Sequence, residues 1–291
     1  MLQNGGAVEG LSPVRWVTSA RSIELSSQRP RIMGIINLTP DSFSDGGRLL
    51  STEEAVEEAL RMEEIGVDVV DFGAESTRPG AEPVSEEEEL RRLLPVLRKV
   101  AVRLTVPISV DTYKGRVARV ALAEGAEIVN DVSGGKWDTG VWEAVREYEA
   151  GYVLVHSRGR PKTMQADAVY RDVVQEVKQE MSVRLAQCKE AGIPLDRILC
   201  DAGFGFAKTR EQNWSLLRNL ADFAEMGRPL LVGVSRKSFL RDLVGLEHQD
   251  TASLAVEILA STKGAAVWRV HDVDGAVAAR KVFSALQGGF S

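Results

Sequence analysis

Polar side chains follow several short apolar runs of this sequence, at the points where buried strands would end. They are Asn37, Asp111, Asn130 with Asp131, His156, Asp201, His271 with Asp272, and, just after an apolar run that ends at Gly233, Lys237 with Ser238. A carboxylate beside an apolar strand is costly to bury without a partner, so each one should face solvent, a helix start or a ligand. Because polar residues of this kind follow so many different strands, the pattern favours a single binding site that they share.

Three of these residues suit a flat heterocyclic ligand. Asp111 and Asp201 supply carboxylates and Asn130 supplies an amide, which together could bind several N–H donors and carbonyl acceptors along one edge of a ring. A metal site is the alternative interpretation. Two carboxylates and an amide without a neighbouring histidine are, however, a poor donor set for a transition metal.

Positive charge gathers near the same predicted site. Arg78, Arg269 and His271 indicate an anionic ligand group such as phosphate, with salt bridges to neighbouring acids as the alternative for any one arginine. Segments 37–47 and 75–80 combine glycine and proline with hydroxyl residues, which is typical of mobile loops that cover a site.

The elements that must position these residues form a repeat of a short β-branched run, a polar loop and an amphipathic helix closed by glycine, which recurs eight times. This repeat predicts a (β/α)₈ TIM barrel. An open doubly wound sheet is the alternative, but no glycine-rich dinucleotide motif follows the first strand. Segment 14–25 predicts a short N-terminal hairpin that plugs the barrel. We expect residues 1–12 to be disordered and residues 13–291 to form a single domain.

Composition excludes several other classes of protein. The 291 residues carry 36 Lys and Arg against 42 Asp and Glu, a net charge of −6, which offers no general attraction to nucleic acids or anionic membranes. No apolar run approaches the length of a membrane span, and no signal peptide is evident, so we expect a cytoplasmic protein.

The motifs around these residues resemble those of the dihydropteroate synthase family, which belongs to the pterin-binding enzymes of folate biosynthesis. The resemblance spans nearly the whole chain. It is carried by RIMGIINLTPDSFSDGG (31–47), VDFGAESTRPGA (70–81), ISVDTYK (108–114), IVNDVSGG (128–135), LVHSRGRPKTMQ (154–165), DAGFGFAKT (201–209), VGVSRKSFL (232–240) and RVHDV (269–273). Eight ordered motifs of this length are highly specific.

The resemblance implies a (β/α)₈ barrel that condenses (7,8-dihydropterin-6-yl)methyl diphosphate with 4-aminobenzoate, giving dihydropteroate and diphosphate. It implies that the pterin is bound by Asp111, Asn130, Asp201, Lys237 and Arg269. It implies that the diphosphate is bound by Asn37, Thr77, Arg78, Arg269 and His271, with Mg²⁺ contacted by Asn37. The implied 4-aminobenzoate site comprises Thr77, Pro79, Phe206 and Ser238. Catalytic roles fall to Asp111, Lys237, Arg269 and His271, and the family pattern implies a homodimer formed through barrel helices.

Two departures from the family pattern lie in the segment after the sixth barrel strand. Ala202 stands where proline is usual, and Ala207 replaces a glycine before Lys208. Both leave the implied ligand residues in place. Three alternatives are a corrinoid-dependent methyltransferase that shares the pterin acids, a catalytically silent pterin-binding paralogue, and a barrel enzyme acting on sugar phosphates.

Overall fold

The structure is a computed structural model that describes residues 14–39 and 51–288. The predicted disordered residues 1–12 and most of the predicted loop 37–47 lie outside these ranges. The strands are β1 Val14–Val17, β2 Ser22–Leu25, β3 Arg31–Asn37, β4 Val69–Gly73, β5 Ile108–Asp111, β6 Ile128–Asp131, β7 Gly151–Val155, β8 Ile198–Asp201, β9 Leu230–Val232 and β10 Ala265–Val270. The helices are α1 Thr52–Ile65, α2 Glu86–Val100, α3 Gly115–Ala123, α4 Gly140–Glu147, α5 Val173–Glu190, α6 Arg210–Arg218, α7 Ser238–Val244, α8 Gln249–Ser261 and α9 Val273–Leu286. The 3₁₀ helices within the described residues are η2 Met164–Asp167, η3 Leu195–Arg197, η4 Leu220–Met226 and η5 Leu246–His248.

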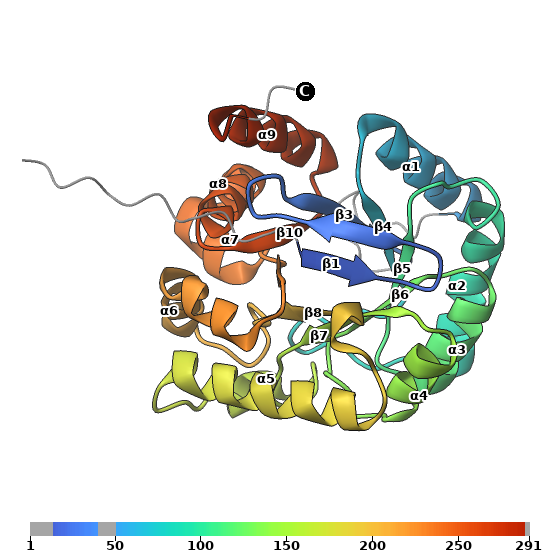
Figure 1. Ribbon diagram of the computed structural model, residues 1–291, viewed down its shortest axis with the longest axis horizontal. Coiled ribbons are helices and arrows are strands. Elements are labelled where there is room, and N and C mark those ends of the chain that lie inside the picture. Colours follow the sequence, from blue (N-terminus) through green and yellow to red (C-terminus); the bar gives the residue numbers. More distant parts are fainter. Residues whose placement is uncertain (1–13, 40–50, 289–291) are drawn as a thin grey trace, which may run out of the picture.

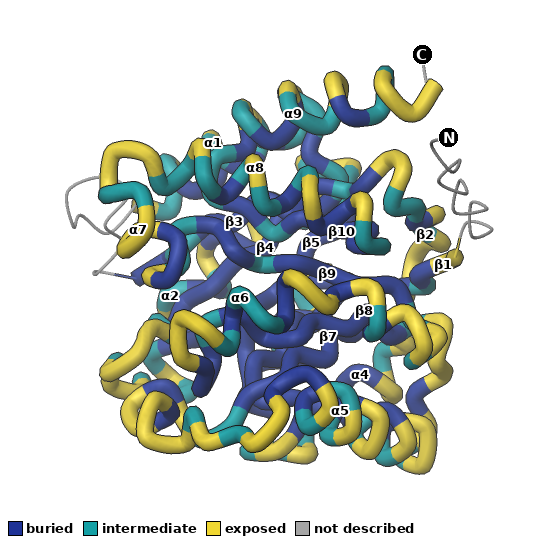
Figure 2. Tube along the Cα trace, turned by 90° about the vertical axis from the view of Figure 1, so that its left-hand side faces the viewer, coloured by how far each residue is buried: buried dark blue, intermediate teal, exposed yellow. Residues whose placement is uncertain are grey.

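Strands β3 to β10 close into a barrel, each pairing in parallel with its neighbours, and β10 closes the ring against β3. The helices surround this ring, so that the strands are buried and the helices expose their outer sides (Figures 1 and 2). The predicted (β/α)₈ barrel is confirmed. Among the described helices, none is both long and apolar enough to cross a membrane.

The predicted N-terminal hairpin is also confirmed. Strands β1 and β2 pair antiparallel and lie across the barrel (Figure 1). Trp16 and Leu25 are buried and pack in the same apolar cluster as the inward-facing strand residues. The Trp16 indole donates a hydrogen bond to the carbonyl of Arg197, 2.9 Å away, just before β8 begins. The hairpin therefore closes the amino-terminal end of the barrel and leaves the opposite end for a ligand.

Alternation along the strands divides the core in two. Side chains that face outward pack against the helices, whereas every second residue faces the barrel axis. The lower inward layer is apolar and consists of Met33, Val69, Ile128, Val153, Leu199, Leu231 and Val267. Two residues further along β4, β6, β8 and β10, at the carboxyl end, the inward positions are polar, namely Asp71, Asn130, Asp201 and Arg269.

Candidate active site

The polar layer at the carboxyl end of the barrel brings together residues that are far apart in sequence. Its inward positions include Asp71 and Gly73 of β4, Ser109 and Asp111 of β5, Asn130 of β6, Asp201 of β8 and Arg269 of β10. The three residues predicted to bind a heterocycle, Asp111, Asn130 and Asp201, all belong to this layer. Each is at least nine-tenths buried.

Arg269 is held by two carboxylates. Its Nε donates to Asp71 Oδ2 at 2.7 Å, and a terminal nitrogen donates to Asp111 Oδ2 at 2.7 Å. Asp71 has no exposed surface at all. Sequence reasoning missed Asp71, because it lies inside a strand rather than at its end. The strand pattern could have indicated Asp71, because residues two apart on a strand face the same side. Asp71 lies two residues before Gly73, which faces the barrel axis, so its carboxylate must face the axis too.

Four buried polar atoms of this layer lack a hydrogen-bond partner in the part of the chain that the structure describes. They are Asp71 Oδ1, Ser109 Oγ, Asp111 Oδ1 and Asn130 Oδ1. Leaving a buried polar atom unpaired costs roughly 1–3 kcal/mol, so a native structure rarely tolerates several together unless a ligand completes them. These acceptors favour a ligand with several N–H donors on one edge.

Two inward glycines leave space above this layer. A Cβ on Gly73 would lie 3.7 Å from Asp111 Cβ, and a Cβ on Gly233 would lie 3.6 Å from Asp201 Oδ2. Larger residues at either position would extend into the space between the polar side chains.

Among the described residues, no three His, Cys, Asp or Glu side chains are grouped so that they could hold a metal ion. The unpartnered buried acceptors and the space left by Gly73 and Gly233 fit the heterocycle interpretation.

Burial shifts the charge state of the site. It raises the pKa of Asp111 to about 7, although Arg269 opposes the rise. Burial also raises the pKa of Asp201, and it lowers the pKa of Lys237 to about 8. The Lys237 ammonium lies 4.2 Å from the centre of the Phe206 ring, a cation–π contact that joins the loops after β9 and β8. A planar ligand that donates to Asp111 would restore its carboxylate form.

His271 is oriented by Ser235. The Ser235 hydroxyl accepts from the backbone N–H of His271 at 3.1 Å and lies 3.0 Å from His271 Nδ1. The hydroxyl can donate its own proton to Nδ1, and in that tautomer the ring proton lies on Nε2. Burial and the nearby Arg236 hold the pKa of His271 well below its usual value. Without a ligand, His271 is therefore a neutral hydrogen-bond donor rather than a cation.

The loop after β4 carries Thr77, Arg78 and Pro79 at the surface of the site. Thr77 is half-buried, and Arg78 and Pro79 are exposed. The start of the loop is fixed by Glu75, which accepts from the Tyr113 hydroxyl at 2.7 Å and pairs with the Lys114 ammonium. Ser238 begins α7 and is exposed. Asn37 ends β3 next to Gly73.

Three other strand-end residues face away from the barrel axis. Asp131 accepts from the Tyr152 hydroxyl at 2.8 Å and from the Gly135 N–H at 2.7 Å, and Asp272 caps α9. His156 contacts α5 and the loop after β8. These three residues support surrounding structure and do not line the polar layer.

Comparison with known proteins agrees with this geometry. The family model described as "Pterin binding enzyme" matches residues 33–271. The dihydropteroate synthase of Escherichia coli K12 is 44% identical over 268 residues, which cover 91% of this chain and 95% of that protein. A structure of the Xanthomonas albilineans dihydropteroate synthase with 4-aminobenzoic acid is 41% identical with a TM-score of 0.86, covering 96% of this chain and 100% of the other.

A second structure of the Xanthomonas albilineans enzyme, in complex with 7,8-dihydropteroate, is 39% identical with a TM-score of 0.82. It covers 95% of this chain and 100% of the other. The likeness thus extends over nearly the whole chain. This chain belongs to the dihydropteroate synthase family of pterin-binding enzymes.

Proposed function

We propose that this chain condenses (7,8-dihydropterin-6-yl)methyl diphosphate with 4-aminobenzoate, giving 7,8-dihydropteroate and diphosphate. The observation that carries this proposal is the layer of unpartnered buried acceptors at the carboxyl end of the barrel. Family membership, together with the 4-aminobenzoate and 7,8-dihydropteroate complexes of the Xanthomonas albilineans relative, supports both substrates. We propose further that residues 13–291 act as one domain.

The pterin is assigned to the polar layer. Asp111, Asn130 and Asp201 would bind the ring edge, since their buried oxygens match its N–H groups. Lys237 would donate a hydrogen bond to the ring, and the guanidinium of Arg269 would pack on its face. The unpartnered Asp111 Oδ1 and Asn130 Oδ1 belong to neighbouring strands, paired at this position, so one ligand edge can reach both.

The diphosphate is assigned to the opening of the barrel, where Asn37, Thr77, Arg78, Arg269 and His271 would bind it. His271 Nε2–H, oriented by Ser235, can donate to a phosphoryl oxygen. Asn37 offers a neutral amide oxygen, which fits Mg²⁺, because this ion is often held by few protein ligands together with substrate phosphates. Bound Mg²⁺ would neutralise negative charge on the departing diphosphate.

The 4-aminobenzoate is assigned to Thr77, Pro79, Phe206 and Ser238. Phe206 is buried and supplies an aromatic wall, whereas the half-buried Thr77 and the exposed Pro79 and Ser238 come from two other loops. This site adjoins the pterin because Lys237, a proposed pterin ligand, lies on the Phe206 ring. The amine could therefore reach the pterin methylene carbon.

The proposed reaction uses no covalent enzyme intermediate. The bond between the methylene carbon and the diphosphate oxygen breaks, and the diphosphate leaves with the electron pair. The resulting cation is delocalised over the pterin ring, where the Asp111 carboxylate stabilises it electrostatically. The neutral amine of 4-aminobenzoate then forms the new C–N bond and loses a proton to water. Arg269 and His271 stabilise the departing diphosphate, and Lys237 fixes the ring.

Diphosphate release by the purified protein tests this function. We expect release with Mg²⁺, the pterin diphosphate and 4-aminobenzoate, and almost none when 4-aminobenzoate is omitted. Asp111→Asn should lower kcat by about 100-fold, a value typical for loss of one electrostatic stabiliser. Pterin binding without release would favour the silent paralogue, and absence of pterin binding would contradict the assignment. Full turnover by Asp111→Asn with weaker pterin binding would contradict the electrostatic role alone.

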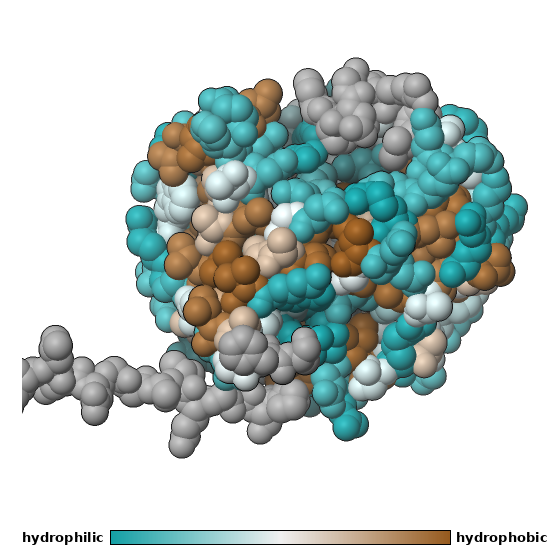
Figure 3. Space-filling model, turned by 90° about the horizontal axis from the view of Figure 1, so that it is seen from above, coloured by the Kyte–Doolittle hydropathy of each residue, from teal (hydrophilic) through white to brown (hydrophobic). Residues whose placement is uncertain are grey.

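We also propose a homodimer formed through barrel helices. Apolar side chains are exposed on neighbouring elements near the carboxyl end of the chain, namely Leu243 of α7, Leu246 of η5, Leu259 of α8, and Val282 and Leu286 of α9. Figure 3 looks onto the side that carries α9 and α1 and shows apolar surface there between polar residues. Contiguous apolar surface of this kind is typical of subunit interfaces.

A further inference from the structure

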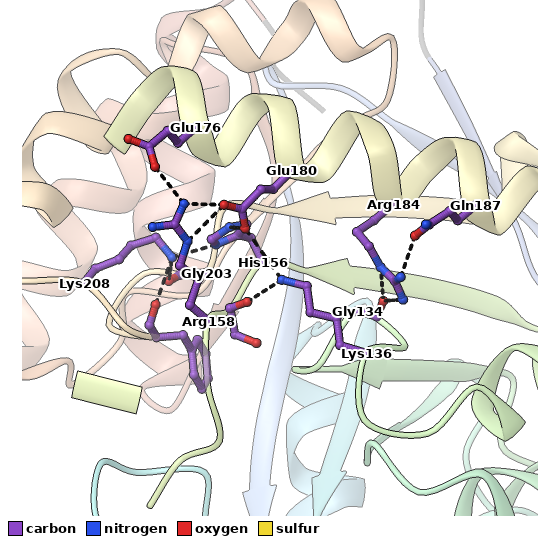
Figure 4. Close-up of polar contacts among 12 residues, drawn as sticks. Gly134, Lys136, His156, Arg158, Glu176, Glu180, Arg184, Gln187, Gly203 and Lys208 are labelled. Atoms are coloured by element: carbon purple, nitrogen blue, oxygen red, sulfur yellow. Dashed lines mark hydrogen bonds and ion pairs between the residues drawn. The ribbon is translucent and has the colours of Figure 1, made fainter. Parts of the chain in front are cut away.

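A buried lysine lies behind the active site, in a group that the proposed reaction does not use. Lys208, at the end of the loop after β8, is only 3% exposed. It is hydrogen-bonded to His156, which follows β7, and His156 is in turn hydrogen-bonded to Glu180 of α5 (Figure 4). The group therefore joins two barrel strands to the helix that covers them, on the outer side of the barrel wall.

The hydrogen bonds of this group fix its protons. His156 Nε2 lies 3.0 Å from Glu180 Oε2, and Arg158 also pairs with Glu180, which indicates an ionised carboxylate that only accepts. His156 Nε2 must then be the donor. Burial and the nearby Lys208 lower the pKa of His156 to about 3, so the ring is neutral and Nδ1 is an acceptor.

Lys208 consequently donates in all three of its contacts. Its Nζ lies 3.0 Å from His156 Nδ1, 2.9 Å from the Gly203 carbonyl and 3.0 Å from the Phe206 carbonyl. A neutral amine has only two protons to donate, so three acceptors require the ammonium form. Burial lowers the pKa of Lys208 to about 7, and the Asp201 carboxylate opposes that shift.

The two carbonyls belong to a loop whose backbone conformation is unfavourable on its own. Gly203, Gly205 and Ala207 have φ angles of 70°, 80° and 50°. A left-handed conformation costs a residue with a side chain roughly 1–2 kcal/mol, so Ala207 needs outside support. Gly203 packs so closely on His156 that a Cβ there would clash with the His156 carbonyl.

We infer that Lys208, oriented by His156 and Glu180, is a positioning residue that holds the 203–207 loop in its substrate-binding form. The inference rests on the proposed function, because this loop carries Phe206, the proposed wall of the 4-aminobenzoate site. The ammonium binds the carbonyl of Phe206 itself, and so fixes the ring from behind. The Gly203 N–H also donates to Asp201 Oδ1 at 2.7 Å, but Asp201 itself belongs to strand β8, whose pairing with β7 and β9 fixes its backbone.

Lys208→Met tests the role of the ammonium, since it keeps the length of the side chain and removes all three donors. At saturating pterin diphosphate, the KM for 4-aminobenzoate should rise about tenfold or more, as expected for loss of hydrogen bonds from a charged group. The Kd for pterin diphosphate should change less than about threefold. A merely structural role would weaken both substrates together.

Lys136→Met is the matched control. Lys136 lies 3.7 Å from the same Glu180, but it donates to the Ser157 carbonyl and does not contact the 203–207 loop in the described structure. This variant removes the same charge from the same group and should leave the KM for 4-aminobenzoate within about twofold of wild type. An equal rise in both variants would overturn the inference.

Two substitutions at His156 extend the test if Lys208→Met does not fold. His156→Asn keeps an acceptor near the position of Nδ1 and should preserve the low KM for 4-aminobenzoate. His156→Gln keeps a donor near Nε2 but loses the acceptor for Lys208, so it should raise that KM. Equal KM values in these two variants would overturn the orienting role of His156.

Hydrogen exchange of the 203–208 amides separates this inference from the proposed function. Exchange should be faster in Lys208→Met, or in His156→Gln, than in Lys136→Met, whatever reaction the protein catalyses. If wild type shows no 4-aminobenzoate-dependent turnover while exchange follows this order, the proposed function fails and the loop anchor stands. Unchanged exchange in an active enzyme would refute the loop anchor alone.

Discussion

Asp71 and Arg269 are 198 residues apart and form an ion pair in the barrel interior at 2.6 Å. Asp71 Oδ1 has no partner in the described structure, whereas Asp71 Oδ2 accepts from Arg269. Asp71 therefore has a supporting role, because it fixes the guanidinium that is assigned to the pterin face and the diphosphate. Buried charges of this kind are tolerated only when paired, so loss of either partner affects the other.

Asp71→Asn is expected to impair substrate binding. The substitution keeps the shape of the side chain but removes the negative charge beside Arg269 Nε, so the guanidinium should become misplaced. We expect kcat/KM for the pterin diphosphate to fall by about 10- to 100-fold, in line with about 1.5–3 kcal/mol for a hydrogen bond to a charged group. Steady-state kinetics on a variant with a wild-type far-UV circular dichroism spectrum would measure this. An unchanged kcat/KM would contradict the supporting role.

Ala207, which replaces a glycine of the family pattern, has a left-handed backbone conformation that only the structure reveals. Its φ of 50° explains why glycine is usual there, since only glycine adopts this conformation without strain. The substitution retains the loop because Lys208 and the neighbouring glycines hold the backbone in place. Ala202, the other departure, is buried directly after β8 and leaves Asp201 in the polar layer.

At the level of elements, α8 contains a buried acid that contributes nothing to the proposed site. Glu257 has no exposed surface, and neither of its carboxyl oxygens has a partner within the described ranges. Burial, reinforced by Asp272 and Asp250, raises the pKa of Glu257 well above its usual value. The folded protein therefore holds a neutral carboxylic acid between helix and barrel.

Glu257→Gln should stabilise the protein at neutral and alkaline pH. In the unfolded chain Glu257 ionises above about pH 4.5, whereas in the fold it stays protonated, so folding takes up a proton and stability falls as the pH rises. The loss is about 1.4 kcal/mol per pH unit over that window. Glutamine is neutral in both states and removes this slope. Urea unfolding at pH 5 and pH 8 should show a larger gain at pH 8, and an equal gain at both would contradict the proton uptake.

Strand alternation explains which strand-end residues reach the site. Asp131 occupies an outward position on β6, next to the inward Asn130, and Asp111 and Asp201 are also inward. His156 and Asp272 follow β7 and β10 and contact a helix or cap one. The sequence pattern predicted where each strand ends. It could have sorted these residues too, because neighbouring positions on a strand point to opposite faces.

For the whole molecule, the exposed apolar side chains of α7, η5, α8 and α9 account for five of the ten large exposed apolar residues that the structure describes. Three of them, Leu259, Val282 and Leu286, lie on α8 and α9, which cover the barrel wall and carry none of the proposed ligand residues. Dimerisation through this side would leave the polar layer accessible in both copies.

Leu259→Glu should convert the proposed homodimer to monomer. Leu259 is 60% exposed on α8, and a charge there would have to be buried without a partner at the interface. Val183→Glu on α5 is the control, because Val183 is 51% exposed and lies outside the proposed interface. Sedimentation velocity should show a dimer for wild type and for the control. A wild-type monomer, or a Leu259→Glu dimer, would contradict the proposed interface.

The sequence by itself determined the eightfold βα repeat, the N-terminal hairpin and the family, because periodicity and motifs are local properties of the chain. It also indicated Asp111, Asn130 and Asp201 as a group, since parallel strands of a barrel must end on the same side. Only the tertiary structure decided the partners of each charge. The contacts of Arg269 with Asp71 and of Lys208 with His156 join segments 198 and 52 residues apart. Closure of the barrel brings these segments together. The residue pattern of one strand does not show which distant residues its side chains will contact.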